Sequence, residues 1–352
     1  MNYFITIFFI ATILAIAGCG GGGGAAPVSS SGGSSSFSTI PDLTWNSTVN
    51  PANIASYKTS EYIAQFGLNE IDAADAYSLL ETNGKAIGGD DIKIGISDSG
   101  VLDTHKEISA NYDAADSTSP TDTEGHGTHV ASTAAGVKDG VGMHGVAFNA
   151  QIISVNLLGD NTDGSGGGAG IIFAGNAGAK VVNMSWEFVE SCSVGDARCV
   201  DGQRTMFAEN TTNDSNYLSI KSYLSSEFAS AVTNDVVMAV AAGNDGDSTH
   251  LAMPALFAGD AVTNGQMIAV AAVDKNGNIA FYSNQCKQAK NFCLAAPGGS
   301  GFSGDGNNIF AADITTDSSY VEKAGTSMAT PHVAGAAAVL LAAWPYLSAS
   351  QT

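Results

Sequence analysis

The chain has 352 residues, of which 44% are hydrophobic, so it is long enough to bury one large core. Acidic residues outnumber basic ones by 34 to 13, which gives a formal net charge of −21 at pH 7. This surplus argues against nucleic acid or an anionic membrane surface as a partner, and it favours a soluble, self-repelling surface over an acidic face for a basic partner.

The first segment in chain order is an apolar run from Phe4 to Ala17. Its length of about 14 residues is too short for a helix that crosses a ~30 Å hydrocarbon core, and it is typical of a secretory signal peptide. The sequence Ile16-Ala17-Gly18-Cys19 that follows resembles a bacterial lipobox. The resemblance implies that residues 1–18 are a lipoprotein signal peptide and that Cys19 carries lipid. The alternative is an ordinary signal peptide followed by an incidental cysteine.

Residues 19–60 are predicted to form a flexible tether. The stretch from residue 20 to residue 38 consists mostly of Gly, Ser and Ala, which cannot bury a core. A single folded domain is predicted for residues 61–352. Its first part, "EYIAQFGLNEIDAADAYSLL", carries helix-spaced apolar residues and ends at the turn signal "TNGK".

Short apolar runs rich in Val and Ile then alternate with helix-like runs. Strands are predicted at residues 92–97, 151–157, 180–185, 235–242 and 267–273, and helices near 127–137, 167–178, 217–234 and 326–343. Unbroken apolar strands separated by helices indicate an α/β fold with a doubly wound, mostly parallel sheet that has helices on both faces. In such sheets, sites form beyond the carboxyl ends of the strands.

Four polar residues stand at the ends of these predicted elements. Asp98 in "ISDSG" and Asn244 in "AAGNDG" each follow a strand, whereas His126 in "GHGTHVA" and Ser327 in "GTSMATPHVAG" each begin a helix. Acyl transfer needs a nucleophile, a base, a group that orients the base, and donors for the developing oxyanion. Glycines beside all four leave room for a substrate to approach.

The segments around Asp98, His126 and Ser327 resemble, in the same order, the signature blocks of the subtilisin-like serine proteases, or subtilases. The resemblance covers roughly residues 61–350. It implies a subtilisin-like fold with Ser327 as nucleophile, His126 as general base and then acid, and Asp98 as the group that holds the imidazole. It further implies an oxyanion hole made by the Asn244 side chain and the Ser327 backbone N–H. No cofactor is expected for this chemistry.

Two further stretches, "LLGDNTDGSG" and "VVNMSWE", resemble the segments that flank a peptide substrate in this family. Relatives carry glycines just after a Leu that Trp186 replaces here, so Glu187 departs from the pattern. At the rim, the Glu187 carboxylate would favour a basic side chain at P1, the substrate residue before the cleaved bond, whereas Trp186 could form an apolar wall that favours Phe or Leu. Because burial of apolar area outweighs a rim charge, we expect an apolar P1 side chain, with Glu187 modulating that preference. The residues that the resemblance places around the substrate are Gly164, Ser165, Gly166, Ser185, Trp186, Glu187, Ala241, Ala242 and Gly243.

The chain has five cysteines, an odd number, and lipidation of Cys19 would leave four. These four form two local pairs, Cys192 with Cys199 and Cys286 with Cys293, and an exported protein can form disulfides. Four cysteines allow three connectivities, of which we favour the one with two local disulfides. Free buried thiols are the alternative.

Two groups of residues have side chains of the types that bind metal ions. His126 and His129 lie near Glu124, but "HGTH" lacks the i, i+4 histidine pair of a zincin helix, so no catalytic metal is predicted. Acidic loops could hold structural calcium through oxygen ligands, and such loops are also common without metal. The acidic loop residues concerned are Asp160, Asp163, Asp245 and Asp247.

Lipidation combined with an exported catalytic domain resembles the subtilisin-like autotransporters of Gram-negative surfaces, whose "EY…QFGL" opening is similar to "EYIAQFGL" here. The resemblance implies an outer-membrane or cell-surface lipoprotein that acts on peptide or protein substrates. The final "WPYLSASQT" stands where relatives begin a further helix, so we expect a C-terminal truncation. Two alternative functions are a general esterase or amidase and a catalytically inactive adhesin. An extended-peptide cleft argues against the first, and four intact catalytic residue types argue against the second.

Overall fold

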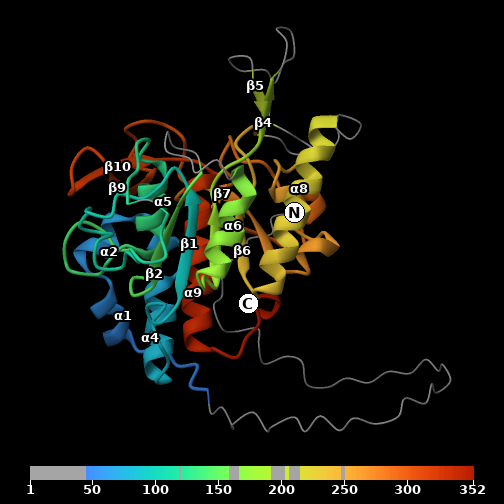
Figure 1. Ribbon diagram of the computed structural model, residues 1–352. Helices are drawn as coiled ribbons and strands as arrows, with labels where there is room; N and C mark the ends of the chain where they lie inside the picture. Colours follow the sequence, from blue (N-terminus) through green and yellow to red (C-terminus); the bar gives the residue numbers. More distant parts are fainter. Residues whose placement is uncertain (1–44, 119, 158–165, 192–202, 206–214, 247–249) are drawn as a thin grey trace, which may run out of the picture.

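The computed structural model describes residues 45–352 except 119, 158–165, 192–202, 206–214 and 247–249 (Figure 1). Its centre is a six-stranded sheet in the order β2-β1-β3-β6-β7-β8, and every neighbouring pair is parallel. This arrangement confirms the predicted α/β class. The strands of the sheet are β1 (Lys93–Asp98), β2 (Gln151–Asn156), β3 (Val181–Met184), β6 (Val237–Ala241), β7 (Met267–Val273) and β8 (Cys293–Pro297).

Helices cover both faces of the sheet (Figure 1). On one face lie α5 (His126–Ala135) and α9 (Thr326–Ala343), and on the other lie α6 (Gly166–Asn176) and α8 (Ser215–Thr233). Within β6, Val237 and Ala239 belong to the core on the α5 and α9 face, whereas Met238 and Val240 belong to the core on the other face. Successive side chains of a strand point to opposite faces, so a sheet covered on both faces requires the unbroken apolar runs seen in the sequence.

Helix α9 is the central buried helix of the fold. Among the described residues it is the only helix long and apolar enough to cross a membrane, but 83% of that stretch is buried inside the protein. It packs against β3, β6, β7 and β8 and against α5. Its apolar composition is therefore explained by its position in the core.

The folded part begins earlier than predicted. Helix α1 (Pro51–Tyr57) packs against α4 (Ala73–Thr82), and Trp45 lies against Trp344 with ring centroids 5.8 Å apart. The domain boundary placed at residue 61 was therefore wrong, because residues 45–60 belong to the folded body. The rest of the predicted tether, residues 19–44, lies outside the described residues, as does the predicted signal peptide, residues 1–18.

The helix-spaced run after Glu61 is divided into three helices rather than one. Extended backbone at Gln65 separates α2 (Ser60–Ala64) from α3 (Phe66–Glu70). The Gln65 side chain contacts His332 of α9, with 3.3 Å between Oε1 and Nε2. This tertiary contact and the left-handed backbone of Asp72 before α4 explain the interruptions, which helical spacing alone does not predict.

The remaining elements are short and lie outside the main sheet. Strands β4 (Val189–Ser191) and β5 (Gln203–Thr205) form an antiparallel pair that projects from the body in Figure 1. A second antiparallel pair consists of β9 (Ile309–Asp313) and β10 (Ser319–Lys323). The short 3₁₀ turns are η1 (Ala255–Phe257), η2 (Ala261–Thr263), η3 (Lys287–Ala289) and η4 (Ala349–Gln351). A disulfide joins Cys286 to Cys293, as predicted. Cys19, Cys192 and Cys199 lie outside the described residues.

Candidate active site

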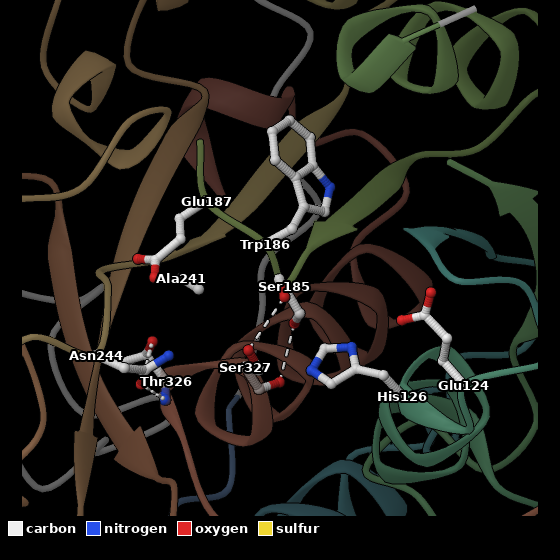
Figure 2. A pocket seen from close by; sticks show the side chains of 9 residues that line it. All are labelled: Glu124, His126, Ser185, Trp186, Glu187, Ala241, Asn244, Thr326 and Ser327. Atoms are coloured by element: carbon white, nitrogen blue, oxygen red, sulfur yellow. Dashed lines mark hydrogen bonds between the residues drawn. The ribbon is translucent and has the colours of Figure 1, made fainter. Parts of the chain in front are cut away.

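The sheet topology brings the four chemically distinctive residues to one place. Asp98 ends β1, Asn244 follows β6, and β3 lies between these strands. His126 begins α5, and Ser327 lies in the first turn of α9. Because the strands are parallel, their carboxyl ends meet at one edge of the sheet. A cavity of about 260 Å³ opens there (Figure 2), and its lining residues are Glu124, His126, Ser185, Trp186, Glu187, Ala241, Asn244, Thr326 and Ser327.

Asp98 holds the ring of His126. The imidazole Nδ1 donates a hydrogen bond to Asp98 Oδ1 at 2.7 Å, and the same oxygen accepts the backbone N–H of Ser99 at 2.8 Å. Asp98 is fully buried, whereas 28% of the His126 side chain is exposed. Burial lowers the pKa of His126, but the charge of Asp98 and its hydrogen bond raise it, and the net shift of the pKa is upward. Because Nδ1 is hydrogen-bonded to Asp98, Nε2 is the ring nitrogen available to the cavity. In Figure 2 the ring faces Ser327.

The hydroxyl of Ser327 is held by Ser185 rather than by His126. Ser327 Oγ donates to the Ser185 carbonyl oxygen at 3.1 Å, and Ser185 Oγ donates to the Ser327 carbonyl oxygen at 2.9 Å (Figure 2). Asn183 of β3 donates from Nδ2 to Ser185 Oγ at 2.9 Å, which fixes the segment after β3. Contacts between a nucleophile and its base are often loose in a substrate-free protein and tighten when substrate binds. Ser327 and His126 both line the cavity, although no hydrogen bond joins them.

Asn244 presents its amide in one orientation. Its Oδ1 accepts hydrogen bonds from the backbone N–H of Thr326 at 2.8 Å and from the Thr326 hydroxyl at 3.0 Å. Because the carbonyl oxygen is engaged, the donor group Nδ2 is left for the cavity. The neighbouring Ser327 N–H lies in the first turn of α9, where helical N–H groups lack intrahelical acceptors. Asn244 and Ser327 both line the cavity, so these two N–H groups are candidate donors there.

Glu187 and Trp186 point in different directions from the segment that follows β3. The ring of Trp186 is 7% exposed and packs at right angles to Phe188, and its Nε1 donates to Ser97 Oγ at 3.4 Å. In Figure 2 the indole points away from Ser327. Trp186 thus borders the cavity but places its ring in the core, which corrects the expectation that it could form an apolar wall for the substrate.

The carboxylate of Glu187 lies in the cavity wall with few partners. Its Oε1 accepts a 3.4 Å hydrogen bond from Thr205 Oγ1, which also donates to Asp245 Oδ1 at 2.8 Å. Its Oε2 is buried and has no hydrogen-bond partner. Burial, followed by the charge of Asp245, raises the pKa of Glu187 to about 7. The hydrogen bonds from Thr205 and the Asn244 backbone lower this pKa by a smaller amount.

The predicted substrate-binding residues are only partly brought together. Ser185, Trp186, Glu187 and Ala241 line the cavity, whereas Ala242 is buried in the core. Gly243 lies behind Glu187, and a Cβ there would come within 3.0 Å of Glu187 Oε2. Gly164 and Ser165 lie outside the described residues, and Gly166 is the first residue of α6.

Two lining residues were not predicted as site residues. Glu124 stands two residues before His126, and Thr326 stands immediately before Ser327. Thr326 belongs to a quoted signature block and Glu124 directly precedes one, so closeness in sequence to a candidate catalytic residue was the available signal. The role of Thr326 in holding Asn244 depends on a contact across 82 residues, which the sequence does not display.

The structure also places the residues considered as metal ligands. His129 is buried outside the lining of the cavity, where its Nε2 donates to the Ile309 carbonyl oxygen at 3.0 Å, and burial lowers its pKa to about 3. Asp245 accepts two hydrogen bonds, from the Thr205 hydroxyl to Oδ1 at 2.8 Å and from Asn284 Nδ2 to Oδ2 at 3.0 Å. Within the part of the chain that the structure describes, no group of three or more His, Cys, Asp or Glu side chains could hold a metal ion. Asp160, Asp163 and Asp247 lie outside that part, and structural calcium stays a prediction.

Comparison with known proteins agrees with this geometry. Residues 89–352 match the model of the subtilase family. The extracellular serine protease of Serratia marcescens is 30% identical over 344 residues, which cover 84% of this chain but only 31% of that protein. Subtilisin DY of Bacillus licheniformis is 32% identical over 274 residues, covering 75% of this chain and 81% of the relative. A solved structure of a protease from Pseudoalteromonas arctica superposes with a TM-score of 0.57 and 26% identity, covering 83% of this chain and 88% of that one.

Proposed function

The chain belongs to the subtilase family of serine proteases, and from this premise we propose that it is an endopeptidase with Ser327 as nucleophile and His126 as general base. The observation that carries the proposal is the 2.7 Å hydrogen bond between His126 and the buried Asp98, at the wall of a cavity that Ser327 and Asn244 also line. This arrangement supplies each of the four roles that acyl transfer needs.

In the proposed first step, Ser327 Oγ leaves the Ser185 carbonyl and attacks the carbonyl carbon of the scissile peptide bond. Its proton passes to His126 Nε2, and the charge of Asp98 stabilises the imidazolium that forms. The negative charge on the tetrahedral oxygen is met by the Ser327 N–H and by Asn244 Nδ2, because Thr326 already engages the amide oxygen.

In the second step the intermediate collapses. The C–N bond breaks, His126 returns the proton to the leaving amine, and the acyl group remains on Ser327. Water then attacks the ester with His126 again as base, and the acid product leaves with Ser327 restored. Every proton in this sequence is carried by groups of the chain or by water, so the proposed chemistry needs no cofactor.

The test is labelling with a fluorophosphonate, which reacts with an activated serine. We expect the wild-type protein to be labelled and Ser327→Ala to be unlabelled, while Ser350→Ala, at an exposed serine near the end of the chain, keeps full labelling. Thermal unfolding of all three proteins verifies that they are folded. Labelling of Ser327→Ala at the wild-type rate would contradict the assignment of the nucleophile.

A second measurement separates the alternatives within this chemistry. An endopeptidase should cleave an extended peptide internally, and a general esterase or amidase should prefer a small ester or amide. We expect internal peptide cleavage, because family members bind the substrate as an added strand. An inactive adhesin on the same scaffold would cleave neither substrate and would not be labelled.

We also propose that the protein is exported and attached to a membrane through lipid on Cys19. The proposal is supported by the lipobox-like sequence after the apolar run and by the exported relative from Serratia marcescens, which is named an extracellular protease. The lipid is proposed to hold the protein at the outer membrane or cell surface, as in the lipoproteins that the sequence resembles.

A further inference from the structure

Among the described residues, the cavity beside Ser327 is lined by two acidic side chains and by one basic side chain, that of His126. Among its nine lining residues there are two carboxylates, Glu187 near Asn244 and Glu124 beyond His126, and there is no Lys or Arg (Figure 2). Asp245 lies next to Glu187 and shares the hydroxyl of Thr205 with it. In Figure 2 His126 lies on the other side of Ser327 from Glu187, so no Lys or Arg among the described lining residues balances the negative charge at the Glu187 end of the cavity.

Glu187 is also short of hydrogen-bond donors. Its Oε2 is buried without a partner that meets hydrogen-bond geometry, and the carboxylate is otherwise faced only by the long bond from Thr205 to Oε1 and by the Asn244 backbone. A buried carboxylate oxygen without a donor is costly, and this residue sits next to a second carboxylate, Asp245. The absence of a Cβ at Gly243 gives the carboxylate the room to lie where it does. A group that brought both positive charge and N–H donors would satisfy it.

Resting on the proposed function, we infer that Glu187 is a specificity-determining residue that selects Lys or Arg at P1. The P1 side chain is carried by the α-carbon next to the carbonyl carbon that Ser327 attacks, so the cavity that Ser327, Asn244 and Glu187 line together is the space beside it. Lys and Arg side chains carry donors only and are positively charged, which matches a carboxylate with an unpartnered oxygen.

The orientation of Trp186 removes the main reason to expect an apolar P1 residue. That expectation required the indole to form a wall of the cavity, but its ring is 7% exposed and lies against Phe188 in the core. The apolar residue left beside Glu187 in the lining is Ala241, a single methyl group. The remaining wall is polar or charged, so electrostatic complementarity outweighs the burial of apolar area.

The ionisation of Glu187 makes this selectivity depend on pH. Its carboxylate is faced by Thr205 from β5 and by the Asn244 backbone and Asp245 after β6, and Asp245 is the charged group among them. Burial and Asp245 raise the pKa of Glu187 to about 7, so its charge develops as pH rises through that range. The preference for a basic P1 residue should therefore strengthen between pH 6 and pH 8. The protonation of His126 affects all peptides alike and cancels in a ratio of two substrates.

The test compares peptides that differ only at P1, with Lys, Arg or Met, the last being a neutral side chain of similar length. We expect wild type to show a higher kcat/KM for Lys and Arg than for Met at pH 8. Glu187→Gln, which keeps the shape and removes the charge, should lower the Lys-to-Met ratio by about tenfold. The matched control is Glu124→Gln, which removes the same charge from the far side of His126 and should change the ratio less than about twofold. An unchanged ratio in Glu187→Gln, or a wild-type preference for Met, overturns the inference.

A binding measurement keeps this result separate from the proposed function. Ser327→Ala should bind the Lys peptide more tightly than the Met peptide in fluorescence anisotropy, and Ser327→Ala with Glu187→Gln should bind the two equally. Equal binding by Ser327→Ala contradicts the role of Glu187 even if the wild-type protein is labelled by fluorophosphonate. Failure of labelling in the wild type contradicts the proposed nucleophile instead, whatever the binding preference.

Discussion

At the scale of single residues, the pair formed by Asp98 and His126 sets the pH range in which the proposed base can work. Burial disfavours the charged imidazole, while the negative charge and hydrogen bond of Asp98 favour it, and the second effect is larger because the pKa of His126 is raised. Only the neutral imidazole can accept the proton of Ser327. Activity should therefore be lost as pH falls through a pKa that lies above the ordinary histidine value.

We predict that kcat/KM for a peptide with a neutral P1 residue rises with pH along a single titration whose midpoint lies above the ordinary histidine value of about 6.5. Asp98→Asn should lower kcat by roughly 10⁴-fold, the size seen when the same substitution is made in another serine protease, and should move the midpoint to lower pH. The measurement is a pH–rate profile for both proteins. A midpoint that does not move in Asp98→Asn would show that Asp98 does not tune His126.

At the scale of elements, the approach of α5 to β1 depends on glycine. Gly127 is the second residue of α5, and a Cβ built on it would collide with the carbonyl oxygen of Gly100 and come within 3.1 Å of the Asp98 Cβ. The helix can therefore bring His126 within 2.7 Å of Asp98 only if its second residue has no side chain. This explains the glycine after the histidine in "GHGTH" as a packing requirement of the site.

We predict that Gly127→Ala lowers kcat by about 100-fold, because displacement of α5 by an ångström misplaces the base. Overpacking should also lower the free energy of unfolding by about 1–3 kcal/mol. The control is Gly84→Ala, at a left-handed position where an added Cβ meets no atom within 4 Å, which should cost about 1 kcal/mol and leave kcat unchanged. Steady-state kinetics and denaturant unfolding measure both effects. Equal activity of the two variants would remove the packing explanation.

At the scale of the whole molecule, the two ends of α9 have different surroundings. Ser327 lies in its first turn, and Trp344 follows its last residue and contacts Trp45. An 18-residue helix is about 27 Å long, so the folded body begins far from the proposed nucleophile. A lipid anchor that precedes residue 45 would thus hold the domain by the end opposite its cavity, which leaves the cavity accessible to protein substrates.

We predict that Cys19→Ser moves the protein from the detergent phase to the aqueous phase in detergent partitioning, because the lipid cannot be attached without the thiol. One acyl chain gives only weak membrane binding, and lipoprotein anchors carry more than one, so the change should be large. Ser30→Ala, in the same segment, is the control and should partition like the wild type. Detergent-phase recovery of Cys19→Ser equal to the wild type would refute the anchor.

The sequence by itself determined the family, the fold class and five of the six strands of the sheet. The strands could be predicted because a sheet covered on both faces needs continuous apolar segments, as in β6 and β7. The four proposed catalytic positions could be predicted because each stands in a short motif beside glycine at the end of an element. Both signals are local, and a local pattern can be read without knowing what packs against it.

Tertiary structure alone decided the features that depend on distant partners. The sixth strand, β8, lies at the edge of the sheet and is only partly buried, and "CLAAP" contains no Val or Ile, the residues by which the other strands were predicted. Residues 45–60 are ordered through contacts with α4 and Trp344, which lie far away in the chain. Trp186 and Glu187 are neighbours in sequence, yet one ring enters the core and the other side chain lines the cavity. Adjacent side chains of an extended chain point in opposite directions, and the packing of the surrounding helices and strands determines which of the two side chains faces the cavity.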